Sequence, residues 1–232
     1  MMENQDIVFF LPTRKGSERV LQKNTRDFAG ISGGILHLKL QQLLDLDLPY
    51  PIVVSTNDEA TIAVAASFNS PRIHIVERPD YLCQSATNIT DFINYIPTII
   101  PQGHVFWVHA TAPFVTSETY LRALELYKNL PPQYDSLFSV NKIQQFLWDP
   151  ETNRCINHDR SVLKWPRTQD LKPLFEINHA FYINSIANYK TYEDRIGNAP
   201  YYFELNKLEA FDIDWDDDFK VAEHIYRSLH GV

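Results

Sequence analysis

The sequence predicts a three-layer α/β fold with a mostly parallel β-sheet between two layers of helices. Short β-rich runs alternate with segments of helical periodicity, which is typical of a parallel sheet covered on both faces. The first run, residues 7–11, is continuously apolar and ends at Pro12, as expected of a strand buried on both faces. The 232 residues, 44% of them hydrophobic and 22% charged, suit one domain with a sizeable core.

The elements follow from hydrophobic periodicity. Five strands are expected in the first part of the chain, at residues 7–11, 52–55, 73–76, 105–108 and 136–140. Helices are expected between them at residues 35–44, 60–68 and 90–96, with a fourth that begins at Thr116 or Ser117. A later strand at residues 179–183 and a closing helix through residues 219–229 complete the expected core.

Residues 141–176 interrupt this alternation. The segment is rich in turn residues and carries aromatic side chains of the kind found at surfaces, among them Trp148 and Trp165. It is too short to form a core of its own, and no repeat or Gly/Ser linker separates it from the rest. We therefore expect one domain over residues 1–232, with an excursion at about 141–176.

Charge and cysteine content exclude several classes of function. The chain has 21 Lys and Arg against 29 Asp and Glu, a net charge of -8, which argues against a nucleic-acid partner. Cys83 and Cys155 form no CxxC pair, so no zinc knuckle or redox motif is expected. The first six residues are polar, and no apolar run reaches the ~20 residues of a membrane helix. A cytoplasmic protein without a membrane partner is expected.

A basic segment follows the first strand, where open α/β sheets bind their ligands. It reads Arg14-Lys15-Gly16-Ser17-Glu18-Arg19, followed by Lys23-Asn24. Clustered cations, with a glycine that lets backbone N–H groups approach, suit an anionic ligand such as a triphosphate. Neither a P-loop nor a dinucleotide-binding motif is present, and a solvated basic loop is the alternative interpretation.

Asp212 and Asp214 are the candidate metal ligands. In an extended segment, residues two apart point the same way, so both carboxylates can bind one Mg²⁺ or Mn²⁺ ion. The acidic residues that follow, 216–218, are expected at the start of the last helix, where negative charge is favourable. His109, at the end of the fourth strand, is placed to touch a ligand.

Taken together and in order, these segments resemble the acylneuraminate cytidylyltransferases. The matching segments are residues 12–19 with 23–24, 55–59, 78–82, 109–113, 167–170, 178–182 and 212–219. The resemblance implies a Rossmann-like nucleotidyltransferase fold. It also implies a reaction in which the anomeric hydroxyl of a 2-keto-3-deoxy sugar acid, sialic acid or a related nonulosonic acid, attacks the α-phosphorus of CTP. The products are a CMP-sugar and pyrophosphate.

The resemblance also implies a role for each matching residue. Arg14, Lys23 and Asp214 would be catalytic. The nucleotide would be bound by Arg14, Lys15, Ser17, Lys23, Asn24, Arg78, Thr87 and Asn88. The sugar acid would be bound by His109, Arg167, Gln169 and Asn178, and Mg²⁺ by Asp212 and Asp214. The excursion at 141–176 would be the arm of a homodimer.

The chain departs from the family pattern at three positions. Glu18 replaces a lysine, His109 replaces a glutamine, and Ser85 stands where many members carry aspartate. We expect Lys15 to take over the role of the missing lysine, with Glu18 turned outward to pair with Arg19. The alternative function is a catalytically weakened homologue that binds a nucleotide or a partner without turnover.

Overall fold

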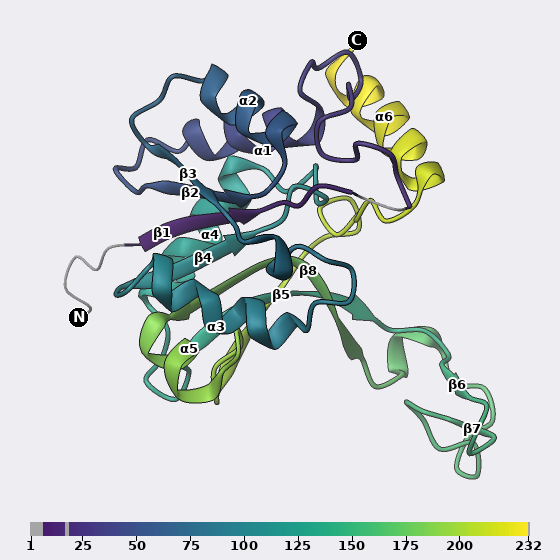
Figure 1. Cartoon of the computed structure of the whole chain (residues 1–232). Helices are drawn as coiled ribbons and strands as arrows, with labels where there is room; N and C mark the ends of the chain where they lie inside the picture. Colours follow the sequence, from purple (N-terminus) through teal and green to yellow (C-terminus); the bar gives the residue numbers. More distant parts are fainter. Residues whose placement is uncertain (1–6, 17–18, 232) are drawn as a thin grey trace.

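The computed structural model describes residues 7–16 and 19–231 and has a seven-stranded sheet at its centre (Figure 1). The strand order is β3-β2-β1-β4-β8-β5-β9. The bounds are β1 Ile7–Pro12, β2 Ile52–Thr56, β3 Ile73–Glu77, β4 His104–Val108, β5 Ser136–Ile143, β8 Leu174–Ser185 and β9 Pro200–Glu204. Of these strands, β8 alone runs antiparallel to its neighbours, β4 and β5, so the sheet is mostly parallel as predicted.

Helices cover both faces of the sheet (Figure 1). On one face lie α1 (Gly34–Leu44), α2 (Glu59–Ser67), α4 (Ser117–Lys128) and α6 (Asp216–His230). On the other lie α3 (Ile89–Ile99) and α5 (Ile186–Tyr192), which pack on Phe10 and Trp107 of the sheet. Each face therefore has its own apolar core, which confirms the predicted three-layer α/β fold.

The order of the strands reverses between β1 and β4. The chain leaves β1 toward β2 and β3 on one side, and then returns to place β4 on the other side of β1. Because the two connections leave in opposite directions, a crevice opens beyond the carboxyl ends of β1 and β4. This crevice is where ligands bind in open α/β sheets.

In the body of the molecule, the α-helix α5 and the β-strand β9 were not predicted. The α5 helix is short and follows β8 directly, and β9 pairs in parallel with β5 at the edge of the sheet. The β9 segment, Pro200–Glu204, begins with proline and ends with a charged residue, so its pattern is that of a loop as much as of a strand. Residues 200–204 form a strand because they pair with β5, and the local sequence pattern cannot show this long-range pairing.

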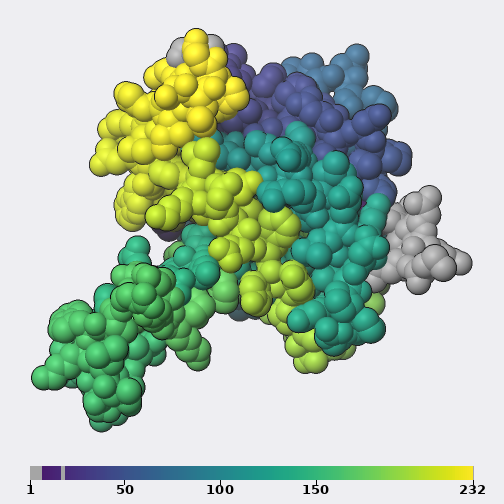
Figure 2. All heavy atoms as spheres, turned by 180° about the vertical axis from the view of Figure 1, so that it is seen from behind, coloured from purple at the N-terminus to yellow at the C-terminus, as the bar shows by residue number. Residues whose placement is uncertain are grey.

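The predicted excursion is a protruding arm. β5 and β8 stay paired as far as Ile143 and Leu174, and the chain between them forms the small hairpin of β6 (Trp148–Asp149) and β7 (Arg154–Cys155). The arm stands clear of the body of the molecule in both views (Figure 1, Figure 2). Its apolar side chains are well exposed, with Val162 at 82% and Trp165 at 69%. Within the described residues, no helix is long and apolar enough to cross a membrane.

A fully buried lysine connects the helix layer to the segment that follows β4. The ammonium group of Lys39, in α1, donates to the carbonyl oxygens of Ala112 (2.8 Å) and Val115 (3.1 Å) and to the hydroxyl of Tyr120 (2.8 Å). All three donors of the group are thus satisfied. Burial lowers the pKa of Lys39 well below its usual range. The contacts fix the path of residues 110–116 beneath the crevice.

Replacing this lysine should destabilise the fold. Lys39→Met keeps the length of the side chain but removes one donor from each of two buried carbonyl oxygens and one hydroxyl, so we expect a loss of about 2–4 kcal/mol in the free energy of unfolding. Urea denaturation measures it. The control is Lys207→Met, at an exposed position, which should change the stability by less than about 0.5 kcal/mol. Equal effects of the two substitutions would contradict this account of Lys39.

Candidate functional site

A cleft of ≈ 520 Å³ lies beyond the carboxyl ends of β1 and β4, at the point where the strand order reverses. Segments that are far apart in the sequence meet in its lining, which we call the central cleft. The lining residues are Pro12, Thr13, Arg14, Arg19, Lys23, Asn24, Arg78, Leu82, Gln84, Ser85, Thr87, Ile89, Phe92, Trp107, His109, Ala110, Thr111, Arg195 and Asp214. Seven of the predicted site residues are therefore brought together.

The basic loop after β1 forms one side of the central cleft. Arg14 donates from Nη1 to Ser85 Oγ (3.3 Å) and to the carbonyl oxygen of Cys83 (3.4 Å). Lys23 Nζ donates to the carbonyl oxygen of Ile213 and lies 3.7 Å from Asp214 Oδ1. Burial lowers the pKa of Lys23, while the neighbouring carboxylates of Asp212 and Asp214 raise it in part. Asn24 lines the cleft beside these cations.

Lys15 faces away from this group of cations. Its ammonium pairs with Glu59 Oε2 at 3.6 Å, and its backbone N–H donates to Asn57 Oδ1 at 2.9 Å. Both contacts draw Lys15 toward the start of α2, outside the lining of the central cleft. Arg19 pairs with Asp214 Oδ1 at 3.3 Å. Ser17 and Glu18 lie outside the described residues, and the expectation that Lys15 replaces the family's lysine stays a prediction.

The segment between β3 and α3 closes another side of the cleft. Arg78 is buried, donates from Nε to Cys83 Sγ (3.0 Å) and from Nη2 to the carbonyl oxygen of Thr13, and stacks its guanidinium over the ring of Phe92 (4.3 Å). Thr87 also lines the cleft. Asn88 is the N-cap of α3, since its side chain accepts from Thr90 N at 3.0 Å, and it lies next to the lining.

The acidic segment runs along the opposite side of Lys23. The backbone N–H of Ile213 donates to the carbonyl oxygen of Thr111 (2.9 Å), and the Asp212 carboxylate forms a hydrogen bond with the Thr111 side chain. Burial raises the pKa of Asp212, and the charge of Asp214 raises it further. Asp218 Oδ2 accepts from Asp214 N (3.1 Å) and from Trp215 N (2.7 Å), so the predicted acidic start of α6 is confirmed.

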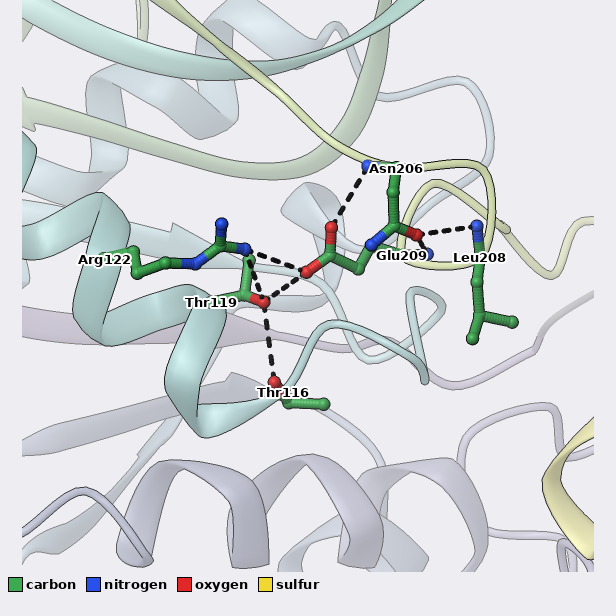
Figure 3. A network of polar contacts seen from close by, with 6 residues as sticks. All are labelled: Thr116, Thr119, Arg122, Asn206, Leu208 and Glu209. Carbon is green, nitrogen blue, oxygen red and sulfur yellow. Dashed lines mark hydrogen bonds and ion pairs between the residues drawn. The ribbon is translucent and has the colours of Figure 1, made fainter. Parts of the chain in front are cut away.

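A buried glutamate holds the turn that leads into this segment (Figure 3). Glu209 accepts from the hydroxyl of Thr119 and from Arg122 Nη2 (3.1 Å), both in α4, and from the backbone N–H of Asn206 (3.1 Å). Asn206 Oδ1 in turn accepts from the backbone of Leu208 (2.9 Å) and of Glu209 (3.0 Å). The turn at 206–211 is thereby fixed to α4, which positions Asp212 and Asp214 beside the cleft.

Asp212 and Asp214 are the candidate donors for a hard divalent cation, since carboxylate oxygens are the ligands that such ions prefer. Asp212 is half-buried, and Thr111 and Lys23 oppose the rise in its pKa that burial causes. Among the residues that the structure describes, no group of three or more His, Cys, Asp or Glu side chains is arranged for a metal ion. Two carboxylates alone suit Mg²⁺, which usually keeps several waters and takes further ligands from substrate phosphates.

The third side of the cleft, over β4 and β8, carries a cation that the sequence did not suggest. Arg195 stacks over the rings of Tyr182 (4.1 Å) and Trp107 (5.0 Å), and its Nη2 donates to His179 Nδ1 (3.1 Å). His109 stacks on Trp107, with ring centroids 5.7 Å apart. Arg195 lies between α5 and β9, and since neither element was predicted, no sequence pattern placed it near the site.

Three of the four residues predicted to bind the sugar acid lie outside the lining of the central cleft. Arg167 pairs with Asp170 (2.8 Å) and Gln169 accepts at its backbone from Gln144, both on the arm. The side chain of Asn178 is used at the bulge between β5 and β8, where Oδ1 accepts from Ser139 Oγ (2.5 Å) and from Ala180 N (3.1 Å). The fourth residue predicted to bind the sugar acid, His109, does line the central cleft.

A cation-rich cleft that includes Asp214, set at the reversal point of a mostly parallel sheet, fits the nucleotidyltransferase class to which the family model and the relatives belong. The family model described as "Cytidylyltransferase" matches residues 8–229, and the chain belongs to this family.

Its relatives include the pseudaminic acid cytidylyltransferase of Campylobacter jejuni, 25% identical over 95% of this chain and 96% of that protein. Another is the CMP-N,N'-diacetyllegionaminic acid synthase of Legionella pneumophila, 27% identical over 94% of this chain and 95% of that protein.

Solved structures share the fold at low sequence identity. The structure of CMP:2-keto-3-deoxy-manno-octonic acid synthetase complexed with CTP has a TM-score of 0.65 at 12% identity and covers 97% of this chain and 99% of its own. The 4-diphosphocytidyl-2C-methyl-D-erythritol synthase of Anaerococcus prevotii also has a TM-score of 0.65, at 10% identity, and covers 96% of this chain and 99% of its own. These likenesses confirm the Rossmann-like nucleotidyltransferase fold.

Three histidines whose pKa values are lowered in the folded chain should make the stability of the protein depend on pH. Burial lowers the pKa values of His104, His109 and His179, with the charge of Arg195 adding to the shift at the last two. Below about pH 6.5 the unfolded chain takes up more protons at these positions than the folded chain does, so stability falls as the pH falls. We expect the free energy of unfolding, measured with urea, to decrease between pH 7.5 and about pH 5.5.

Substitution identifies the source of this dependence. His109→Gln removes one of the three groups and should flatten the slope of stability against pH, by at most about 1.4 kcal/mol per pH unit. His74→Gln, at an exposed position in β3, is the matched control. An unchanged slope in the His109 variant would contradict the assignment.

Proposed function

We propose that the protein transfers a cytidylyl group from CTP to a sugar acid of the nonulosonic class, with release of pyrophosphate. The observation that carries this proposal is the convergence of Arg14, Lys23, Asn24 and Asp214 around one cleft at the reversal point of the sheet, with Asp212 beside Lys23 and Thr111. The names of the relatives, which are synthases of CMP-linked pseudaminic and legionaminic acids, support the class of acceptor.

In the proposed reaction the cations of the first loop bind the triphosphate. Arg14 has no carboxylate partner among the described residues, so its guanidinium is available for two parallel hydrogen bonds to phosphate. Lys23 supplies a point charge beside it. Phosphoryl-type transfer requires in-line positioning and stabilisation of charge and no covalent nucleophile, which is what these side chains provide.

The remaining residues position the two substrates. Arg78, Thr87 and Asn88 border the part of the cleft between β3 and α3, which we assign to cytosine and ribose. Asp212 and Asp214 would hold Mg²⁺ or Mn²⁺, which supplies compensation for the charge on the phosphates. His109 stays neutral at neutral pH because burial lowers its pKa, so the histidine adds no charge to the cleft where the family has glutamine.

The direct test is an assay of pyrophosphate release from CTP with a panel of nonulosonic acids, including sialic, legionaminic and pseudaminic acids. Release that depends on one of the acids supports the proposal. Binding of CTP without turnover of any acid would favour the alternative, a homologue that binds nucleotide and does not catalyse.

The metal site predicts the effect of removing either carboxylate. Asp212→Asn and Asp214→Asn keep the shape of the side chain but reduce the charge that holds the cation, so turnover should fall by roughly 10²-fold or more. The measurement is turnover at limiting Mg²⁺. Asp217→Asn, in the first turn of α6, is the matched control and should keep its activity. Near wild-type rates in both single variants would refute the metal role.

We further propose that the protein is a cytoplasmic homodimer built through the arm. Both cysteines of the chain are free thiols, which a reducing compartment preserves. The arm exposes large apolar side chains that a second copy would bury, among them Ile156, Val162, Leu163 and Trp165. Since the arm carries Arg167 and Gln169 away from the body, these two residues reach a sugar acid only at the cleft of a partner.

Light scattering tests the homodimer. We expect a mass of twice 27.0 kDa at micromolar concentration. The double variant Val162→Ser, Trp165→Ser removes exposed apolar surface that packs on no core and should shift the protein toward the monomer while its secondary structure is unchanged. A 27.0 kDa species at every concentration of the wild-type protein contradicts the proposal.

A further inference from the structure

Besides Arg14 and the buried Arg78, the central cleft contains a further cation without a carboxylate partner among the described residues, on a different side from Arg14. Among residues 7–16 and 19–231, Arg195 forms no ion pair, whereas Arg19 and Lys23 both pair with Asp214. An arginine in this position can bind an anionic ligand without first breaking an ion pair with a carboxylate of the protein.

Its neighbours hold the guanidinium in place. The group lies over the faces of Tyr182 and Trp107, at 4.1 Å and 5.0 Å, and one of its nitrogens is fixed by His179 Nδ1 at 3.1 Å. His179 Nδ1 is also 2.5 Å from the hydroxyl of Tyr182. Because a planar guanidinium held on aromatic faces loses little freedom when it binds, Arg195 is preorganised for a planar anion.

Two further polar atoms beside Arg195 lack a hydrogen-bond partner in the part of the chain that the structure describes. They are Nε1 of Trp107, a residue only 1% exposed, and Nε2 of His109, and both residues line the cleft. An indole nitrogen can only donate a hydrogen bond, and leaving a buried polar group unpaired costs about 1–3 kcal/mol. The same side of the cleft therefore offers a fixed positive charge and at least one unused donor.

The reaction proposed above supplies two anions, and the sheet separates the places for them. Arg14 follows β1, whereas Trp107 belongs to β4 and Tyr182 to β8, in the spatial order β1-β4-β8. The triphosphate is assigned to the loop after β1. The carboxylate of the acceptor is the remaining anion, and the side of the cleft over β4 and β8 is the remaining place for one.

We propose that Arg195, backed by Tyr182 and Trp107, binds the carboxylate of the sugar acid and thereby selects acidic acceptors over neutral sugars. The assignment rests on the proposed function, because it concerns the acceptor of that reaction. It gives the acceptor side of the cleft a specificity residue that belongs to the same chain as the nucleotide-binding loop.

The first test is steady-state kinetics of Arg195→Ala and Arg195→Lys with the best acid of the panel. Loss of a charge-assisted pair should raise the KM for the acid by roughly 10- to 100-fold in Arg195→Ala, with partial rescue in Arg195→Lys. The KM for CTP, and the Kd for CTP measured by calorimetry, should stay within about twofold. Arg227→Ala, at an exposed pair with Glu223 in α6, is the matched control and should change neither constant.

The second test pairs the variant with the methyl ester of the same acid. In the wild-type protein the ester should have a KM roughly 10- to 100-fold above that of the acid, and in Arg195→Ala the two should be nearly equal. An undiminished preference for the acid in the variant overturns the proposal, because another group must then read the carboxylate. A raised KM or Kd for CTP also overturns it, since Arg195 would then serve the nucleotide.

Failure of the proposed function looks different. A wild-type protein that releases no pyrophosphate with any acid overturns the proposed function, and the assignment of Arg195 falls with it. A wild-type protein that turns over an acid with a KM unaffected by Arg195→Ala leaves the function in place and rejects only the role of this residue.

Discussion

The placement of β4 directly beside β1 determines where the functional side chains lie. Because the chain reaches β2 and β3 on one side of β1 and β4 on the other, the loops that follow β1 and β4 separate and leave the central cleft between them. The loop after β1 brings Arg14 and Lys23, and the end of β4 brings His109. The last segment before α6 joins them through the bond from Ile213 N to the Thr111 carbonyl oxygen. With a different strand order, these residues would not lie close together in space.

Two buried charged groups support this arrangement from below. Lys39 fixes residues 110–116 to α1, and Glu209 fixes the turn before Asp212 to α4. Both lie outside the cleft, yet each holds one of the two segments that meet at Thr111 and Ile213. Buried polar groups are costly unless all their hydrogen bonds are made, so such contacts specify one conformation of the loops more sharply than apolar packing does.

Much of the fold could be predicted because the signals were local, and half of the residues that the family resemblance proposed for the site line the central cleft. The apolar run at 7–11, the helical spacing of α1 and α4, and the capping acids of α6 each depend on near neighbours in the sequence. The position of Arg195 depends instead on β8 entering the sheet between β4 and β5, which no local pattern encodes. For Asn178, the sequence motif matched the family, but the side chain accepts a hydrogen bond from Ser139 at the bulge between β5 and β8. Similarity of sequence placed the residue in the right strand and could not show which of its neighbours it binds.

In the central cleft, the proposed ligands would replace existing ion pairs between side chains as well as form new contacts. Within the protein itself, the Asp214 carboxylate forms ion pairs with both Arg19 and Lys23. In the proposed function a cation at Asp214 would take the carboxylate from these two side chains, while the triphosphate would offer them new acceptors. Each ligand would therefore replace an interaction that the other disrupts, and binding of either one would favour the other by the same free energy. Arg14 and Arg195 stand outside this exchange, since neither has a carboxylate partner among the described residues. In the proposed function, Arg19 and Lys23 would respond to metal and nucleotide together, whereas Arg14 and Arg195 would each bind one substrate.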